Sequence, residues 1–377
     1  MLYTLLFSLA SVITYYISPT AVTGDGSYDN PYPFNWDENI KQVKRIGGGN
    51  DFILIFLEGD YFPPAGYGIS ITNKNSGSFG SISLKPEDGK KVRFICGTKL
   101  TNWTKSSISD KLWIHHINPE VNINSLFIND QRAILSRAPS STKYARTKKY
   151  IESVDNEDEN YLIRSFEVQE DCIEMLKLLD EEQLLNVNFV DLHYWTYSRE
   201  KIIMLDSSNN VIKTRVSVAE NNRFGVGKVR SGDFYYLENI LSGLNMPGEY
   251  FVFPNNTIIY YQRENEDMTN IEAFIPYGSI GIHSTVRENI TISNLEIMLA
   301  SSGFYLTSQE NLYIQNCTSK HCDQGMFIAN SNNVTVERCL IEDIGGYGLN
   351  VRNNNYLIIN NNIIRGYGQK EHNCHGM

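Results

Sequence analysis

The C-terminal part of the sequence carries a pattern of apolar and polar positions that repeats at a fixed interval. An asparagine recurs every 22 residues, and in the short run after each one every second residue is apolar. The asparagines are Asn289, Asn311, Asn333 and Asn355, and the apolar positions predicted to face inward are Ile292, Ile314, Val336 and Ile358. A glycine opens a further apolar run at Gly303, Gly325 and, after one inserted residue, Gly348. Period-two alternation indicates strands, and a fixed period of about 20–50 residues indicates stacked units.

Three short strands and three corners fit into one 22-residue repeat. Such a repeat is one coil of a parallel β-helix, whose coils stack at roughly the 4.8 Å spacing of paired strands. We expect a right-handed helix, because about 98% of parallel crossover connections have that hand. A leucine-rich repeat has a similar period, but its leucine spacing is absent here. The sequence therefore predicts an all-β fold, a right-handed parallel β-helix with coils of about 22 residues.

Earlier apolar runs predict the first coils of the same helix. Residues 52–57 and 59–62 are expected to be two strands, and residues 81–84 and 92–95 the same strands one coil later. Residues 36–45 form a polar stretch that is compatible with a helix. We expect the N-terminal segment to cap these coils, because an open sheet edge favours pairing with other chains.

The chain begins with an apolar run, residues 2–17, followed by a Ser-Pro-Thr-Ala break. The run has the length of a signal-peptide core with small residues near Ala21, although no positive charge precedes it. We therefore expect residues 1–21 to be a signal peptide and the protein to be secreted or endomembrane. An uncleaved membrane anchor is the alternative. Because a span normally needs about 20 apolar residues, we expect no transmembrane span after cleavage.

Composition and charge narrow the class of partner. Of the 377 residues, 41% are apolar, which is enough for an extended core. The net charge is −10 and basic residues are not clustered, which argues against nucleic acid and anionic membranes as partners. A neutral or weakly charged ligand such as a carbohydrate, here a polysaccharide or another glycan, fits this charge better. The sequence leaves the oligomeric state open, with a monomer expected.

The cysteines do not indicate a disulfide scaffold or a metal site. Cys317 and Cys339 occupy one ladder, where parallel side chains keep the Cβ atoms too far apart for a disulfide, so we expect buried free thiols. Cys322 and Cys374 lie near histidines, but their spacing matches no usual zinc pattern. These histidines are His321, His372 and His375. We therefore expect no metal and no cofactor.

Five Asn-x-Ser/Thr triplets would be N-glycosylation sites in a eukaryotic secretory pathway. They begin at Asn102, Asn255, Asn289, Asn316 and Asn333. Asn316 and Asn333 lie beside ladder positions of the predicted coils, so we discount these two as glycan carriers.

Three phrases in the middle of the chain resemble a known family. Residues 126–140 contain Leu-Phe-Ile-Asn-Asp-Gln-Arg and then Ser-Arg-Ala-Pro, residues 193–202 contain His-Tyr-Trp-Thr-Tyr-Ser-Arg, and residues 247–261 begin with Pro-Gly-Glu-Tyr. Their order and spacing are similar to those of large right-handed β-helix glycoside hydrolases of the fucosidase or xylanase type. Two positions depart from the family pattern, with Asp130 in place of a glycine and Ala138 in place of an aromatic residue.

The resemblance covers about residues 24–377 and implies a β-sandwich-like insert that interrupts the helix. In agreement, the 22-residue rhythm is absent between residues 139 and 268. We therefore divide the chain after residue 21 into N-terminal coils with a cap (22–138), the insert (139–268) and the main helix (269–377).

Glycoside hydrolysis needs two carboxyl groups, about 5–5.5 Å apart for retention and about 6.5–9.5 Å apart for inversion of configuration. Neighbouring coils supply such separations. The register places Asp343 next to His321 of the adjacent coil, so Asp323 and Asp343 share a corner region and are the best candidate pair. Glu342 and His375 are weaker candidates. The competing interpretation is structural, because aspartates at tight corners commonly accept backbone N–H bonds.

The chain ends at Met377, just after another glycine-apolar run has begun. Proteins of the family it resembles continue for further coils, so we expect a C-terminal truncation, which leaves activity open. The first hypothesis is a secreted glycoside hydrolase relative that acts on a polysaccharide through a carboxylate acid/base pair. The second is a non-catalytic carbohydrate-binding or surface-adhesion β-helix, and the third is a polysaccharide lyase. A lyase would need a Ca²⁺-binding carboxylate cluster or a Lys or Arg base on one ladder, and the sequence assembles neither.

Overall fold

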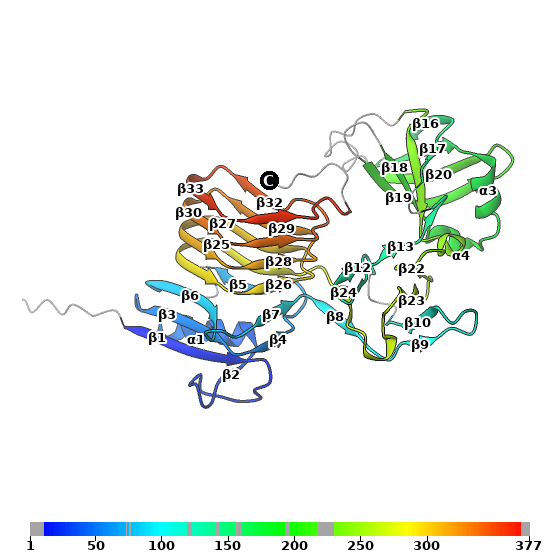
Figure 1. Cartoon of the computed structure of the whole chain (residues 1–377). Helices are drawn as coiled ribbons and strands as arrows, with labels where there is room; N and C mark the ends of the chain where they lie inside the picture. Colours follow the sequence, from blue (N-terminus) through cyan, green and yellow to red (C-terminus); the bar gives the residue numbers. More distant parts are fainter. Residues whose placement is uncertain are drawn as a thin grey trace, which may run out of the picture. The chain divides into compact units, whose positions relative to one another are not determined.

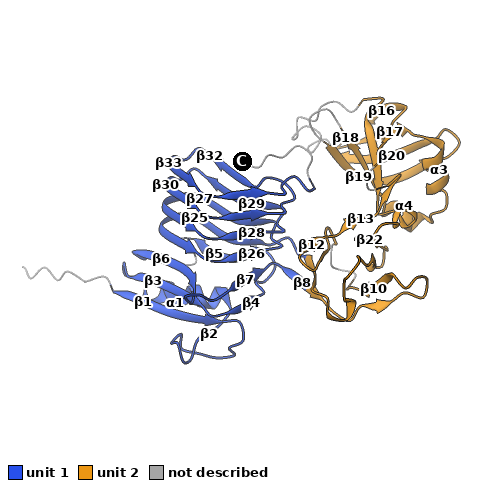
Figure 2. Cartoon of the chain, viewed as in Figure 1, with its two compact units in different colours: residues 1–98, 276–377 blue, residues 99–275 orange. Residues whose placement is uncertain are grey.

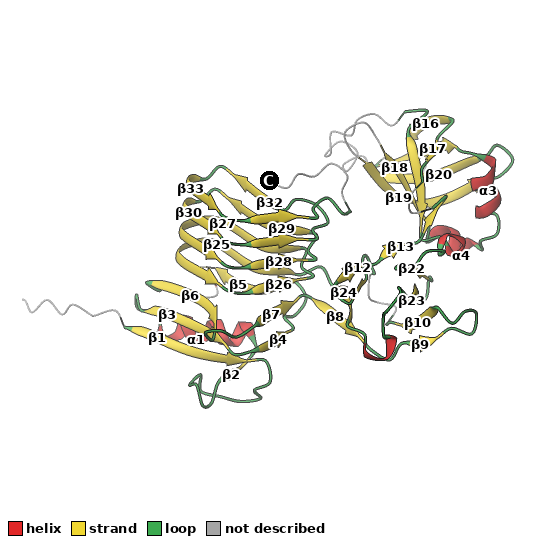
Figure 3. Cartoon of the chain, in the orientation of Figure 1, coloured by secondary structure: helices red, strands yellow, loops and turns green. Residues whose placement is uncertain are grey.

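The structure, a computed structural model, describes residues 11–72, 74, 77–118, 123–140, 143–154, 158, 160–192, 197–217 and 230–370. The chain divides into two compact units (Figure 2). Unit 1 contains Met1–Thr98 and Pro276–Met377, and unit 2 contains Lys99–Ile275. Strands make up most of both units, and the helices are short (Figure 3).

Unit 1 is a stack of coils in which parallel strands pair with the equivalent strands of neighbouring coils (Figure 1). The first and second strands of the coils belong to one sheet. Its members are β1 (Val12–Ser18), β2 (Tyr32–Pro33), β3 (Asp51–Phe56), β5 (Tyr67–Thr72), β6 (Ser81–Pro86), β25 (Ile280–Ser293), β27 (Ser302–Gln315), β29 (Gln324–Ala329), β30 (Asn332–Glu337), β32 (Leu349–Arg352) and β33 (Asn355–Asn360). The third strands form a second sheet. Its members are β4 (Gly59–Tyr61), β7 (Val92–Ile95), β26 (Glu296–Met298), β28 (Thr318–Lys320), β31 (Leu340–Glu342) and β34 (Ile363–Arg365).

Each regular coil has the three strands that the sequence predicts. In one coil these are β29, β30 and β31, whereas β25 and β27 each run without a break through the first two strands of their coils. Ile292 pairs with Ile314 and Ile314 with Val336, so each coil adds 22 residues. All three side chains are completely buried. The β-helix and the inward orientation of these three residues are confirmed.

The N-terminal coils also follow the predicted register. Phe52 of β3 pairs with Ile82 of β6, and Tyr61 of β4 pairs with Phe94 of β7. Phe94 in turn pairs with Ile297 of β26, which lies beyond unit 2 in the sequence. The helix therefore resumes after unit 2 with the coil that stacks directly on the interrupted one, and one core runs through both segments of unit 1.

The recurring glycines are required by close packing between the first and third strands. A Cβ on Gly303 would overlap Ser319 Oγ and lie 2.7 Å from Gly325 O. A Cβ on Gly325 would overlap Gly348 O and lie 2.6 Å from Ile341 Cγ2. Real Cβ atoms cannot approach so closely, so these positions accept only a residue without a side chain.

The last coil departs from the predicted register. Val336 pairs with Ile359 rather than Ile358, because the residue inserted earlier in this coil shifts every later residue by one position. The prediction that Ile358 faces inward is therefore wrong, and its side chain is 56% exposed. Tyr356, with a φ of 48°, rather than Asn355 occupies the corner of the asparagine ladder.

Residues 12–18 of the apolar N-terminal run form β1, which pairs along its length with β3. Ile17 is completely buried, and Ile13 and Tyr15 pack against the same core. Residues 1–10 of the predicted signal peptide lie outside the described residues. The described part of this run is thus a strand of the β-helix.

The predicted helix at residues 36–45 is α1 (Trp36–Ile46), whose N-cap Asn35 accepts a hydrogen bond from Glu38 N. Trp36, Ile40 and Val43 of this helix are buried in the core of unit 1. No helix in the described part of the chain is long and apolar enough to cross a membrane.

Unit 2 is built mainly of antiparallel sheets. The largest contains β14 (Arg137–Ala138), β15 (Ala145–Arg146), β16 (Lys149–Val154), β17 (Tyr161–Glu167), β18 (Asn188–Leu192), β19 (Tyr197–Asp206), β20 (Val211–Ser217) and β21 (Phe234–Glu238). A second contains β9 (Thr104–Lys105), β10 (Leu112–His116), β13 (Ile134–Leu135), β22 (Glu249–Val252) and β23 (Thr257–Tyr261). A third contains β8 (Gly97–Leu100), β11 (Phe127–Ile128), β12 (Gln131–Arg132) and β24 (Ala273–Pro276). Two short helices, α3 (Glu170–Leu176) and α4 (Glu181–Leu185), precede β18.

The compact unit is longer than the insert expected from the sequence. It begins at Lys99 rather than at residue 139 and ends at Ile275 rather than at residue 268. Its own apolar clusters explain the difference, because Trp103 and Leu126 pack in one cluster with Tyr260. Trp103 and Leu126 therefore share a core with residues of the second half of the expected insert.

Candidate functional site

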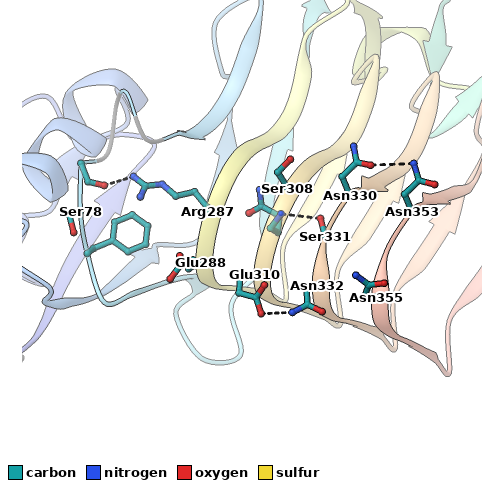
Figure 4. Close-up of a pocket in the computed structure, with 13 residues that line it drawn as sticks. Ser78, Arg287, Glu288, Ser308, Glu310, Asn330, Ser331, Asn332, Asn353 and Asn355 are labelled. Carbon is teal, nitrogen blue, oxygen red and sulfur yellow. Dashed lines mark hydrogen bonds between the residues drawn. The ribbon is translucent and has the colours of Figure 1, made fainter.

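A groove of about 880 Å³ lies in unit 1 at the corner between the first and second strands of successive coils (Figure 4). Most of its lining residues carry carboxylate, amide or hydroxyl groups. The lining consists of Gly77, Ser78, Phe79, Arg287, Glu288, Ser308, Gln309, Glu310, Asn330, Ser331, Asn332, Asn353 and Asn355. Because equivalent residues of four consecutive coils contribute, the groove follows the helix axis.

One wall of the groove is a ladder of two carboxylates followed by two amides. Glu288 pairs with Glu310, Glu310 with Asn332 and Asn332 with Asn355 in the parallel register. Asn332 Nδ2 donates a 2.7 Å hydrogen bond to Glu310 Oε1, which orients that carboxylate (Figure 4). Glu288 is exposed and Glu310 is half-buried. Two carboxyl groups thus stand on adjacent coils, whose backbones are separated by roughly 4.8 Å.

The opposite wall consists of corner residues with left-handed backbone conformations. Ser308, Asn330 and Asn353 have φ values of 54°, 53° and 52° and are all exposed. Asn353 Nδ2 lies 3.3 Å from Asn330 Oδ1 (Figure 4). The floor between the walls includes Gln309 and Ser331, both buried, and Gln309 N donates to Ser331 Oγ at 3.0 Å. These groups offer fixed donors and acceptors to a polar ligand.

Arg287 lies next to Glu288 at the end of the groove that carries the carboxylates. Its guanidinium lies 4.5 Å from the ring centroid of Phe79, and its Nη2 donates to Gly77 O and, at 3.1 Å, to Thr72 O. Burial lowers the pKa of Arg287 from its ordinary value, whereas the charge of neighbouring Glu288 raises it. The arginine therefore lines this end of the groove and also holds the segment at Gly77–Phe79 of the preceding coil.

The carboxylates predicted from the sequence lie at a different corner, between the third and first strands. His321 and Asp343 occupy equivalent positions in adjacent coils, as predicted, and His321 Nδ1 lies 2.6 Å from Asp343 Oδ2. His321 is buried, and Asp343 has a left-handed φ of 49°. Asp323 lies at the same corner, where its carboxylate accepts a 2.7 Å bond from Lys370 Nζ. Both aspartates therefore have basic partners.

The weaker sequence candidates are placed only in part. Glu342 Oε2 accepts from Arg365 Nη2 at 2.6 Å, and its other oxygen lies 4.0 Å from Lys320 Nζ. His375 lies outside the described residues, as do Cys374 and His372. Cys317, Cys322 and Cys339 are buried free thiols, which is the state expected for the ladder pair. Among the described residues, no group of three or more His, Cys, Asp or Glu side chains could hold a metal ion.

Glu288 and Glu310 are not among the residues that the sequence predicts for the site, although the repeat contains their signal. Each directly precedes a ladder asparagine, Asn289 or Asn311, so the two glutamates are separated by one 22-residue coil. The sequence pattern could not show that this corner is hollow. That hollow depends on the loop at Gly77–Phe79, which belongs to a coil more than 200 residues earlier in the chain.

Comparison with known proteins identifies the class of fold. Residues 252–370 match the family model described as a right-handed β-helix region. A solved structure titled "Glycoside hydrolase" is similar with a TM-score of 0.68 and 16% sequence identity, over 90% of this chain and 67% of that chain. A second, titled "The complex structure of XylC with xylose", covers 93% of this chain and 70% of that chain at 10% identity, but its TM-score of 0.24 supports no argument. Among curated proteins, none matches the chain significantly.

The chain is therefore a right-handed parallel β-helix protein with a large insert, and its fold is like that of a glycoside hydrolase. At 16% identity the likeness concerns the fold alone. What the protein does has to be argued from its own side chains.

Proposed function

We propose that this protein acts on glycans as a glycoside hydrolase relative, with the polysaccharide bound in the groove and Glu288 and Glu310 as the carboxylate pair. The observation that carries the proposal is the position of these glutamates, side by side on adjacent coils along a groove of about 880 Å³. The amides and hydroxyls of the groove match the many hydroxyl groups of an uncharged sugar, which both donate and accept hydrogen bonds. The fold shared with a glycoside hydrolase supports the same assignment.

The proposed reaction retains the configuration of the sugar. The coil spacing of roughly 4.8 Å is closer to the ~5–5.5 Å separation of retaining enzymes than to the ~6.5–9.5 Å of inverting ones. Glu288 protonates the glycosidic oxygen as the leaving sugar departs, and the carboxylate of Glu310 bonds to the anomeric carbon. Water then displaces Glu310, gives its proton to Glu288 and leaves the free sugar. Asn332 keeps the Glu310 carboxylate in position.

Asp323 and Asp343 remain the alternative carboxylate pair proposed from the sequence. Against them stand their ion pairs, since Lys370 and His321 contact their carboxylates. Among the described residues, the groove that provides room for a sugar lies at a different corner, between the first and second strands.

The test is hydrolysis of a panel of neutral polysaccharides, measured as release of reducing sugar. Glu288→Gln and Glu310→Gln are expected to fold as the parent does, by circular dichroism, and to lower the rate at least about 100-fold. Asp323→Asn and Asp343→Asn are the matched comparisons, each also replacing a carboxylate by an amide. Loss of hydrolysis in the aspartate variants alone would move the chemistry to the corner predicted from the sequence.

Glycan binding without hydrolysis is the second candidate function, and the amide half of the ladder, Asn332 and Asn355, favours it. It would appear as saturable binding with no sugar released by the parent protein. Calorimetry with the same polysaccharides separates the two functions. Absence of both binding and release across the panel would refute both.

A further inference from the structure

The coil of β5 and β6, which stacks next to the coil of Glu288, has a long connection between its first and second strands. Between the paired positions Thr285 and Ile290 the chain has four residues, 286–289, and the three following coils have the same number. Between their partners in the coil below, Thr72 and Ile82, it has nine, 73–81. The extra residues occur in the coil next to Glu288.

The described end of this long corner borders the groove and is fixed in place. Gly77, Ser78 and Phe79 all line the groove. Arg287 holds them through its bond to Gly77 O and its contact with the Phe79 ring. Asn289 Nδ2 donates a 2.9 Å bond to Gly80 O directly after them. The bordering segment is therefore part of the fold's hydrogen-bond network.

The two ends of the groove consequently differ. At one end Ser78 lies beside Arg287 and Glu288, and at the other the ladder continues through Asn332 to Asn355 (Figure 4). Glu288 is one coil and Glu310 two coils from the segment at Gly77–Phe79, which is roughly 5–10 Å at the usual strand spacing. The part of the groove between this segment and the carboxylates is therefore short, whereas the part along the amide ladder continues for two further coils.

From this geometry we infer that the groove receives the end of a glycan chain and not its middle. The terminal sugar lies against Phe79 and Ser78 beside the carboxylates, and the remaining sugars extend along the amide ladder. The inference rests on the proposed glycan-binding function of the groove. It makes the protein chain-end-directed, so that hydrolysis would release terminal sugars and leave no internally cut products.

End-capped oligosaccharides test this inference separately from catalysis. The probe is the neutral oligosaccharide of the panel that binds best, used uncapped, capped at the reducing end, and capped at the non-reducing end. Capping one end is expected to weaken binding at least about tenfold, and capping the other end to change it less than about twofold. Equal binding of all three forms would overturn the inference while leaving the proposed function intact. Failure of every uncapped oligosaccharide to bind would overturn both.

Two variants tie the effect to the segment at Gly77–Phe79. Phe79→Ala removes the ring at the Gly77–Phe79 end of the groove. If this end is the barrier, the variant is expected to recover at least half of the binding free energy that capping removes. Phe327→Ala is the matched control, since Phe327 is a half-buried ring that stacks 4.8 Å from Tyr305 and does not line the groove. Full discrimination in folded Phe79→Ala would show that the segment is not the barrier and would overturn the inference. Where Phe79→Ala does not fold, Ser78→Trp replaces it, with uncapped binding expected to fall; unchanged binding would count against the barrier.

Discussion

Single residues set the direction of the chain at the corners of this helix. Asn289, Asn311 and Asn333 have φ values of 56°, 56° and 52°, in the left-handed region that asparagine tolerates better than most residues. Their side chains form a ladder, with Asn311 Nδ2 donating to Asn289 Oδ1 at 2.9 Å and Asn333 Nδ2 to Asn311 Oδ1 at 2.7 Å. Tyr356 takes the same backbone conformation in the last coil. The stacked coils therefore impose the corner, and asparagine stabilises it.

The repeat predicts inward positions correctly as long as its period is kept. The glycine spacing indicates one insertion before Gly348, but the predicted register of the following strand does not include it. The prediction therefore places Ile358 at the inward position that Ile359 occupies in the structure. A two-residue side-chain period makes a shift of one residue reverse every orientation, so one missed insertion is sufficient for this error.

Ile314→Asp and Ile358→Asp test the corrected register directly. Ile314 is completely buried, so an aspartate there leaves a charge in the core and is expected to lower the free energy of unfolding by about 4 kcal/mol or more. Ile358 is 56% exposed, and the same change is expected to cost less than about 1 kcal/mol. Thermal and urea unfolding of both variants provides the measurement. Equal losses of stability would restore the original register.

A buried thiol in unit 2 gives stability a defined pH dependence. Burial raises the pKa of Cys172 from its ordinary value of 9.0 to about 12. Between these values the unfolded chain loses the proton that the folded chain keeps, so the free energy of unfolding falls as pH rises, by at most about 1.4 kcal/mol per pH unit. The contribution is complete below pH 9.0 and lost toward about pH 12. Urea unfolding of the parent and of Cys172→Ala between pH 8 and pH 11 measures it, and parallel pH profiles would contradict it.

Among the elements, β1 shows where sequence patterns are ambiguous. An apolar run of about 16 residues at an N-terminus fits a signal-peptide core. Short continuous apolar runs also fit buried strands, and periodicity alone does not separate these interpretations. The structure pairs Val12 through Ile17 with β3, so this segment has a place in the fold. Entry into the secretory pathway remains our proposal, and N-terminal sequencing of the exported protein would show whether β1 is retained.

Removal of β1 tests its structural contribution. Deleting residues 1–21 removes Ile17 from the core and leaves β3 as an unpaired edge. The expected loss of stability is about 3 kcal/mol or more, because one isoleucine and parts of two further apolar side chains are no longer buried. The exposed edge also favours aggregation. Deleting residues 1–10, which leaves β1 in place, is the control. Equal melting temperatures for the two shortened chains would mean that β1 adds nothing to stability.

For the whole molecule, the sequence predicts a helix interrupted by an insert at residues 139–268, whereas the compact unit of the structure spans Lys99–Ile275. The 22-residue rhythm marks only regular coils, and the N-terminal coils are too irregular to show where the rhythm stops. Packing decides the boundary: Leu126 and Trp103 join the cluster of Tyr260 in unit 2, whereas Cys96 joins the core of unit 1. Pattern identifies elements, and the assignment of elements to cores needs three-dimensional contacts.

The interrupted helix is expected to fold without its insert. β7 pairs directly with β26, and Tyr277 N donates a 3.3 Å bond to Cys96 O, so the two ends left by removing residues 99–275 lie close together. Joining Thr98 to Pro276 with a short Gly-Ser linker should give a soluble chain with a cooperative melting transition and a β-sheet circular dichroism spectrum. The groove lies wholly in unit 1, so this shortened chain should also bind the same neutral oligosaccharide within about threefold of the parent affinity. A folded chain that has lost binding would place part of the glycan site in unit 2, whereas failure to fold would make the β-helix dependent on its insert.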